Sequence, residues 1–136
     1  MLATVLREYA AEVRLVFKDM PLRIHSLARA AHEAARCAGA EGQYWPYHDR
    51  LFAEQPRFQR DDLIRYAEEL GLDGERFTRC LDERRYADSV DADVAQGRAL
   101  GITSTPTFLI NGRVLVGAHP LETFRAVIAE ALGRRP

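Results

Sequence analysis

Apolar residues recur at intervals of three and four along most of the chain, with charged residues between them, and this spacing predicts amphipathic helices. One short helix opens the chain, five follow in its middle and one lies near its end. A helix capped by Asp61 or Asp62 and stopped by Gly71 is predicted, together with helices over residues 2–11, 26–38, 43–54, 74–83, 86–100 and 120–132.

Two segments depart from helical spacing and predict β-structure. Val13–Phe17 (VRLVF) is a short, nearly continuous run of apolar and β-branched residues, which is typical of a strand buried in a parallel sheet. Residues 106–110 and 113–116 are apolar runs joined by Asn111-Gly112, and both turn residues tolerate the positive φ of a tight hairpin. The order of elements predicts an α/β fold in which a helical segment separates a parallel strand from a terminal hairpin.

Composition narrows the possible partners. The 136-residue chain is 47% hydrophobic and 29% charged, which predicts one globular domain or two small ones. Its formal net charge of -1 argues against nucleic acid or an anionic membrane surface as a partner. No apolar run approaches the ~18 residues of a membrane span, and residues 1–5 lack the basic and apolar regions of a signal peptide.

Histidines and glycines form no recognisable ligand or cofactor motif. The four histidines are scattered, and the sequence has no His-x-x-x-His or Cys-x-x-Cys spacing, so we predict no metal site. These histidines are His25, His32, His48 and His119. No glycine motif for phosphate or dinucleotide binding is present either, and no cofactor is predicted.

Three further patterns each have a structural and a functional interpretation. An acidic cluster is interpreted as a solvated helix face near arginines rather than a metal site; it comprises Asp82, Glu83, Asp88, Asp91 and Asp93. The pair His48-Asp49 suggests acid–base chemistry, but adjacent helical side chains point ~100° apart, so we expect no pair. Aromatic residues predict a helical core, with a peptide groove as the alternative; they are Tyr44, Trp45, Tyr47, Phe52 and Phe58.

Several segments together resemble the DsbA-like branch of the thioredoxin superfamily. The most specific is Gly101–Gly112, which reads GITSTPTFLING and is followed by Gly117 and Pro120. Other matching stretches, in the same order as in that family, are Val16–Leu22 (VFKDMPL), Gln43–Trp45 with His48-Asp49 and Leu51-Phe52, Glu69–Asp73 (ELGLD), and Phe77 with Cys80-Leu81. The resemblance covers essentially the whole chain from residue 2.

The resemblance implies a thioredoxin-like α/β fold interrupted by an inserted helical domain. Residues 1–21 and 101–136 would form the thioredoxin-like core, and residues 22–100 the helical insert with its connecting helix. It also implies a cis-proline loop at Thr105-Pro106, where the backbone of Thr105 pairs with an extended peptide. Unfolded or extended polypeptide is therefore the expected partner.

The chain departs from the family at its active site. No Cys-x-x-Cys is present, and residues 2–11 match only the back part of the helix that carries it. We assign no catalytic residue, because the exposed thiolate that exchanges disulfides is missing. The central first strand is missing as well. Either Val13–Phe17 pairs directly with Thr107–Ile110, or a second copy fills the gap; we favour a homodimer.

Cys37 and Cys80 have three interpretations. Each shares an apolar helix face, which is typical of buried thiols. A dithiol that is catalytic or binds a soft metal or metalloid is the second. The resemblance adds the third, which we favour: a structural disulfide within the helical domain, worth about 4 kcal/mol at most by loop entropy.

The expected function is that of a DsbA-like thiol–disulfide oxidoreductase domain that is redox-impaired, so whether the chain is an enzyme stays open. The alternatives are a non-redox, chaperone-like module that binds peptide through Thr105 and Pro106, and metal or metalloid binding by Cys37 and Cys80. Family members act in the periplasm or elsewhere outside the cytoplasm, and the chain would then be a truncated form. A chain translated from Met1 as printed is expected in the cytoplasm.

Overall fold

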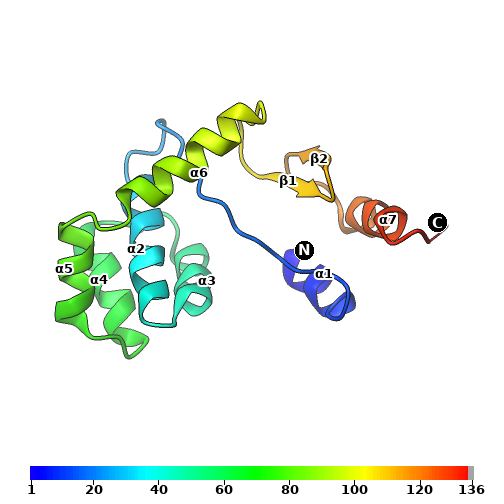
Figure 1. The fold of residues 1–136 in the computed structure, drawn as a ribbon. Coiled ribbons are helices and arrows are strands. Elements are labelled where there is room, and N and C mark those ends of the chain that lie inside the picture. The colour runs from blue at the N-terminus through cyan, green and yellow to red at the C-terminus, as the bar shows by residue number, and fades with distance from the viewer. Residues whose placement is uncertain (135–136) are drawn as a thin grey trace. The chain divides into compact units, whose positions relative to one another are not determined.

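The computed structural model describes residues 1–134 and divides the chain into two compact units (Figure 1). One unit is the continuous segment Asp19–Ala99. The other combines the two ends of the chain, Met1–Lys18 and Leu100–Pro136. Over the described residues the structure is mixed α/β, with seven helices and a small two-stranded sheet. None of the helices among residues 1–134 is long and apolar enough to cross a membrane.

The continuous unit is a bundle of five helices built around the second helix of the chain. These helices are α2 (Ala28–Ala40), α3 (Tyr44–Glu54), α4 (Arg60–Glu69), α5 (Gly74–Asp82) and α6 (Ala87–Ala99). Helix α2 contacts each of the other four. Its buried face is a stripe of alanines, whose small side chains let neighbouring helices approach closely; they are Ala31, Ala34, Ala35 and Ala38. Larger side chains fill the space around the stripe, among them Tyr47, Leu63, Tyr66 and Phe77.

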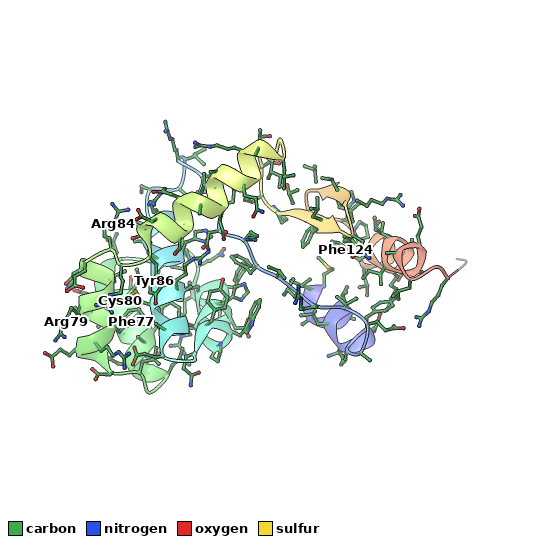
Figure 2. All side chains as sticks on the ribbon, viewed as in Figure 1. Phe77, Arg79, Cys80, Arg84, Tyr86 and Phe124 are labelled. Atoms are coloured by element: carbon green, nitrogen blue, oxygen red, sulfur yellow. A yellow bond between two sulfur atoms is a disulfide. The ribbon has the colours of Figure 1, made fainter. Side chains whose placement is uncertain are left out.

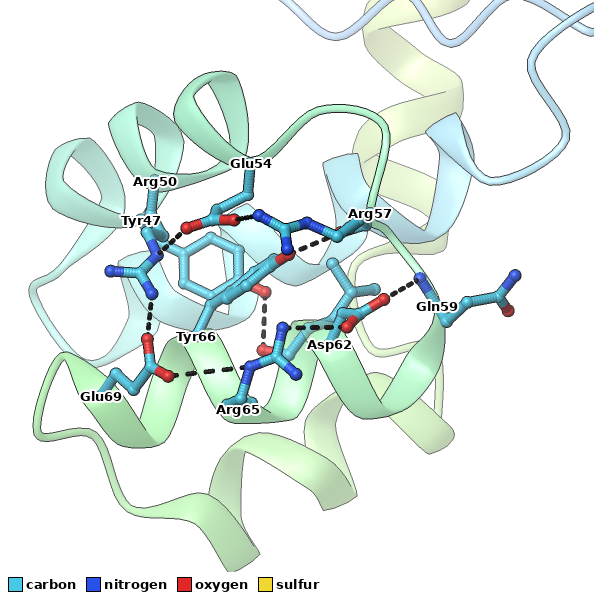
Figure 3. Close-up of polar contacts among 10 residues, drawn as sticks. Tyr47, Arg50, Glu54, Arg57, Gln59, Asp62, Arg65, Tyr66 and Glu69 are labelled. Carbon is cyan, nitrogen blue, oxygen red and sulfur yellow. Dashed lines mark hydrogen bonds and ion pairs between the residues drawn. The ribbon is translucent and has the colours of Figure 1, made fainter.

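Two buried tyrosines connect α4 to α3 and to the loop between these helices through their hydroxyl groups (Figure 3). The Tyr47 hydroxyl donates to the carbonyl oxygen of Leu63 at 2.9 Å, and the Tyr66 hydroxyl donates to that of Arg57 at 2.8 Å. Burial raises the pKa of Tyr47 well above its usual value, so this hydroxyl stays a proton donor. A buried phenol must find a partner to be stable in a core, and both tyrosines satisfy this.

The helix boundaries follow local capping chemistry. Helix α5 begins after Asp73, whose carboxylate accepts from the Arg76 backbone N–H at 3.0 Å. The cap predicted for α4 is wrong by two or three residues, because Gln59 is the N-cap and Asp62 lies inside the first turn. There the Asp62 carboxylate accepts from the Gln59 backbone N–H at 3.2 Å, which is one half of a capping box.

The unit made of the chain ends is a hairpin packed on two helices. It contains α1 (Leu2–Glu8), β1 (Thr107–Ile110), β2 (Arg113–Val116) and α7 (Leu121–Ala131). The strands are antiparallel, and their connecting residues Asn111 and Gly112 have φ values of 46° and 89°, which confirms the predicted hairpin. A small core fixes the sheet to the helices through Val5, Phe124 and Ile128, and the rings of Phe108 and Phe124 meet edge to face at 4.8 Å.

The predicted strand Val13–Phe17 does not form. Among residues 1–134 the only strands are β1 and β2, and β1 pairs with β2 alone. Direct parallel pairing of this segment with Thr107–Ile110, one of the two alternatives, is therefore not present, and the homodimer that we favoured stays a prediction. A strand forms only where a neighbouring strand exchanges backbone hydrogen bonds with it. The composition of one segment does not show whether such a neighbour exists. The first helix also ends at Glu8 rather than residue 11.

Burial within the helical bundle departs from simple helical spacing in two places. Glu33 is buried although it is charged, and its carboxylate pairs with Arg29 at 3.2 Å and Arg84 at 3.0 Å. Trp45 and Phe52, which we expected in the core, are 42% and 59% exposed. The spacing of a helix identifies one apolar stripe, but α3 carries aromatic side chains on more than one face.

The disulfide Cys37–Cys80 is present and joins α2 to α5, with its Cα atoms 6.0 Å apart. Both cysteines are buried beside Phe77 in the bundle core (Figure 2). The third interpretation of the two cysteines is thus confirmed. No thiol remains to act as a soft-metal ligand, since the chain has two cysteines and neither is free.

We predict that removing this disulfide destabilises the helical bundle without changing its fold. The cross-link closes a loop of 43 residues, for which loop entropy gives about 4 kcal/mol as an upper estimate. Urea unfolding of the wild type and of Cys37→Ala/Cys80→Ala, each followed by circular dichroism, measures the loss. The single variant Ile24→Ala, at an exposed position outside the core, serves as the control. Equal unfolding free energies for wild type and double variant would contradict the prediction.

Candidate functional site

The loop before β1 holds the two residues to which the family resemblance assigned peptide binding. Thr105 and Pro106 are both exposed, and the peptide bond between them is cis. The loop is shaped locally, because the Thr107 hydroxyl donates to the carbonyl oxygen of Ser104 at 2.7 Å. The Pro106 carbonyl accepts from the Gly117 backbone N–H at 2.7 Å. This bond extends the β1–β2 ladder by one pair beyond the two strands.

The ladder determines which backbone groups of β1 face away from β2. In an antiparallel pair, hydrogen-bonded and non-hydrogen-bonded residue pairs alternate. Since Pro106 and Gly117 are a bonded pair, the pairs Thr107–Val116 and Leu109–Val114 are the non-bonded ones. The N–H and C=O groups of Thr107 and Leu109 therefore point outward. Within residues 1–134 no second strand pairs with them.

The exposed loop lies directly before this outward edge. Thr105 is two residues before Thr107 and outside the strand, and a cis peptide bond joins it to Pro106. The edge thus presents two outward-facing residues in register, Thr107 and Leu109. A row of unpaired N–H and C=O groups is a template for another extended chain. What this arrangement can do chemically is bind backbone; it holds no nucleophile or acid–base pair.

The acidic cluster on α6 is not wholly solvated as predicted, because Asp93 is buried. Its carboxylate accepts from the Arg36 guanidinium at 2.7 Å and from the Asp19 backbone N–H at 2.9 Å. Asp19 is buried too, and its carboxylate accepts from Arg36 and meets Nδ1 of His32 at 2.8 Å. Three segments meet in this cluster of Asp19, His32, Arg36 and Asp93: the residues before α2, α2 itself and α6.

Asp19 and Arg36 hold each other in their ionised forms. Burial raises the pKa of Asp19, but hydrogen bonds from His32 and Arg36 outweigh it, and the net pKa lies below the ordinary 3.8. Burial lowers the pKa of Arg36, and its hydrogen bond to Asp19 more than restores it, so the guanidinium stays charged. Nearby, burial and the charge of Asp19 raise the pKa of Tyr44. Asp19 and Arg36 thus form a structural ion pair within the cluster.

Sequence reasoning missed this cluster, although part of its signal was visible. His32 and Arg36 are four residues apart, so they share one face of α2. Asp19 follows an apolar run. A carboxylate that is buried with such a run needs an ion-pair or hydrogen-bond partner. Asp93 gave no signal, because four other acids surround it in the sequence and only the fold selects it for burial.

The predicted absence of a His48–Asp49 pair is wrong. Nδ1 of His48 and Oδ1 of Asp49 lie 3.0 Å apart, since side-chain torsions bring the two groups together despite the turn of the helix. The His48 ring also lies against Trp45 and Phe52, at centroid distances of 5.2 Å and 4.7 Å.

Among residues 1–134 no group of three or more histidine, cysteine or acidic side chains is arranged to hold a metal ion.

Comparison with known proteins now decides the family. A family model described as Thioredoxin matches residues 1–130. The chain belongs to the thioredoxin family. The match covers both units of this thioredoxin-family chain, including α1, the helical bundle and the hairpin.

Curated relatives of the thioredoxin-family chain are longer proteins. It is 39% identical over 120 residues to a protein named Na(+)/H(+) antiporter NhaA 3 from Salinispora tropica, which is 88% of this chain and 18% of that protein. It is 37% identical to Na(+)/H(+) antiporter NhaA from Herminiimonas arsenicoxydans, over 88% of this chain and 19% of that protein. The chain spans about a fifth of the length of the curated relatives it matches.

We predict that acid weakens the helical bundle through Asp19. Because the folded-state pKa of Asp19 is lowered, its contribution is complete above the ordinary value of 3.8 and is lost as the pH falls through the lower, folded-state value. Asp19→Asn is expected to cost about 3 kcal/mol at neutral pH, since it removes one partner of a buried ion pair. It should also flatten the acid limb of the stability profile.

Urea unfolding of the wild type and of Asp19→Asn at a series of pH values between 2 and 7 measures both effects. Asp61→Asn is the matched control, because the Asp61 side chain is 97% exposed. An acid limb as steep in Asp19→Asn as in the wild type would count against this assignment.

Proposed function

We propose that this thioredoxin-family chain is a non-redox module that binds extended polypeptide at Thr105, Pro106 and the outer edge of β1. The observation that supports the proposal most directly is the one-sided pairing of β1. Its outward N–H and C=O groups at Thr107 and Leu109 face no strand among residues 1–134, and they continue into the exposed loop at Thr105. Main-chain pairing at such an edge binds extended segments with little regard to sequence.

The β1 edge suits a polypeptide better than the outer edge of β2. On β2 the outward residues are Val114 and Val116, and the chain then turns at Gly117, whose φ of 92° ends the extended conformation. Arg113 also stands at the start of β2 and is half exposed; charged residues commonly protect sheet edges from pairing. No charged residue stands on β1, whose sequence is TFLI.

We further propose that the helical bundle is a DsbA-like insert in a thioredoxin-like core. Contacts divide the chain so that its two ends form one unit and the continuous segment Asp19–Ala99 forms the other. An insertion has this organisation, because the host domain is then discontinuous in sequence. The disulfide Cys37–Cys80 within the bundle supports the same arrangement, since the resemblance implied it there.

A thiol–disulfide oxidoreductase of the DsbA type is the second candidate, and family membership favours it. The cysteines of this chain argue against the oxidoreductase function. Exchange requires an exposed thiolate with a lowered pKa, whereas Cys37 and Cys80 are buried and bonded to each other.

We therefore predict that the chain does not catalyse disulfide exchange. In the presence of dithiothreitol, the turbidity of insulin should rise no faster with the protein than without it. Cys37→Ser/Cys80→Ser should behave like the wild type, because the two cysteines take no part in exchange. Reduction at rates typical of an oxidoreductase, persisting in the double variant, would show that the assignment of a non-redox module is wrong.

We predict that Leu109→Pro weakens peptide binding while Val114→Pro preserves it. Both residues belong to the same non-bonded pair of the ladder and are similarly exposed, at 52% and 49%. Proline at either position leaves the β1–β2 hydrogen bonds intact, but it removes one outward N–H and places a ring on that edge. Leu109→Pro blocks the β1 edge, and Val114→Pro blocks the β2 edge.

Fluorescence anisotropy with a labelled, reduced and alkylated polypeptide measures the dissociation constant. We expect Leu109→Pro to weaken binding about tenfold or more, the equivalent of losing one or two hydrogen bonds and fitting a ring. Circular dichroism checks that both variants fold. Equal affinity for Leu109→Pro and the wild type would refute binding at the β1 edge.

A further inference from the structure

We infer that α6 is held to the helical bundle by charge and separates from it as a unit, while the four-helix core of α2, α3, α4 and α5 stays folded. This property of α6 is independent of peptide binding at β1. It follows from a difference between the contacts that hold α6 and the contacts that hold the other four helices to one another.

Helix α6 takes almost no part in the apolar core of the bundle. Each of the other four helices contributes at least two buried side chains to one hydrophobic cluster, whereas among residues 1–134 no member of that cluster comes from α6. The one buried apolar side chain of α6 is Val90, and further along the helix the Met20 sulfur lies beside Gly97. Packing of an apolar face provides most of the stability of a helix in a protein, and α6 has little such packing.

Two arginines of α2 hold α6 instead. The Arg29 guanidinium donates to the carbonyl oxygen of Ala87 at 3.0 Å, and it lies 2.7 Å from the carboxylate of Asp91. Seven residues further along α2, and therefore on the same face, Arg36 donates to the Asp93 carboxylate at 2.7 Å. The contacts of these two arginines run from the first residue of α6 to its middle.

Ion pairs of this kind hold a helix in place with little net gain in stability. The side chains of Arg36 and Asp93 are 27% and 10% exposed, so the energy of their attraction is offset by the cost of removing them from water. The Arg29–Asp91 pair is more exposed, at 35% and 62%, and exposed pairs contribute little. Separation of α6 returns these charges to water, whereas separation of any other helix exposes part of the hydrophobic cluster. The free energy of opening is therefore lowest at α6.

Separation of α6 changes how the Thr105-Pro106 loop is connected to the bundle. Helix α6 carries one of the two connections between the compact units, because it ends at Ala99 and the chain continues from Leu100 toward the loop and β1 (Figure 1). With α6 in place, this connection begins at the end of a fixed helix. With α6 separated, it begins at Tyr86 and is longer by the 13 residues of α6. The charges on α2 thus control the freedom of the loop without any change in the four-helix core.

Native-state hydrogen exchange, followed by NMR on the full chain, tests the separation directly. The amides of α6 should exchange as one group, with protection about tenfold or more below that of the amides in α2, α4 and α5. Low concentrations of urea should accelerate this group only weakly, because separation exposes less surface than unfolding. If the α6 amides have the protection and urea dependence of the core amides, α6 opens only when the whole bundle unfolds, and the inference is wrong.

A variant in the core distinguishes separation of α6 from global unfolding. Leu63 is fully buried in the hydrophobic cluster on α4, and Leu63→Val should lower the protection of the α4 and α5 amides about fivefold. The protection of α6 should not change, because Leu63 keeps its contacts when α6 separates. An equal fall in the protection of α6 would overturn the inference.

A second variant tests whether charge holds α6. Asp93→Asn removes a charge partner of Arg36 and should lower the protection of the α6 amides about tenfold or more. Asp88→Asn is the matched control, since Asp88 is an exposed acid in the first turn of the same helix; its loss should change protection about threefold or less. Equal effects of the two substitutions would show that the ion pair with Arg36 does not hold α6.

Discussion

The partly buried guanidinium of Arg36, held between two carboxylates, is the interaction on which the organisation of the helical unit depends. Asp19 is the first residue of the segment Asp19–Ala99, and Asp93 lies in its last helix. Arg36 binds both, and the Asp19 backbone N–H donates to Asp93 directly. The place where the chain enters the bundle is thereby joined to the helix by which it leaves. Breaking a buried ion pair leaves an uncompensated charge, so this connection resists opening at neutral pH.

The hairpin unit is held together in a different way. A two-stranded sheet is marginal by itself, and here it depends on one small apolar cluster with Phe124 and Val5. That cluster supports the inner face of β1 only. Among the described residues no strand covers the outer edge of β1, and Leu109 on its outer face is 52% exposed.

The elements that depend on local signals could be predicted from the sequence. The alanine stripe of α2 and the Asn111-Gly112 turn each lie within one segment, and the structure has both. Features that depend on distant partners could not be predicted. Val13–Phe17 has the composition of a strand but no strand to pair with. Asp93 is buried because of Asp19 and Arg36, which are 74 and 57 residues away.

The same distinction applies to the candidate site. Thr105 and Pro106 could be identified from the sequence, because they belong to a motif that resembles a known family. In the structure both residues are exposed. The outward direction of Thr107 and Leu109 required the register of the ladder, which the Pro106–Gly117 hydrogen bond determines. No sequence pattern distinguishes an edge strand from a central one when both are short apolar runs.

Binding and redox chemistry are separable in this architecture, because they draw on different atoms. Disulfide exchange needs a thiolate at a helix N-terminus, and the two sulfurs of this chain are instead used inside the bundle, between α2 and α5. Strand addition needs only backbone groups in register and an apolar surface beside them. Losing the first leaves the second unaffected, since no cysteine contributes to the β1 edge. Disulfide exchange and strand addition therefore place demands on separate parts of the chain.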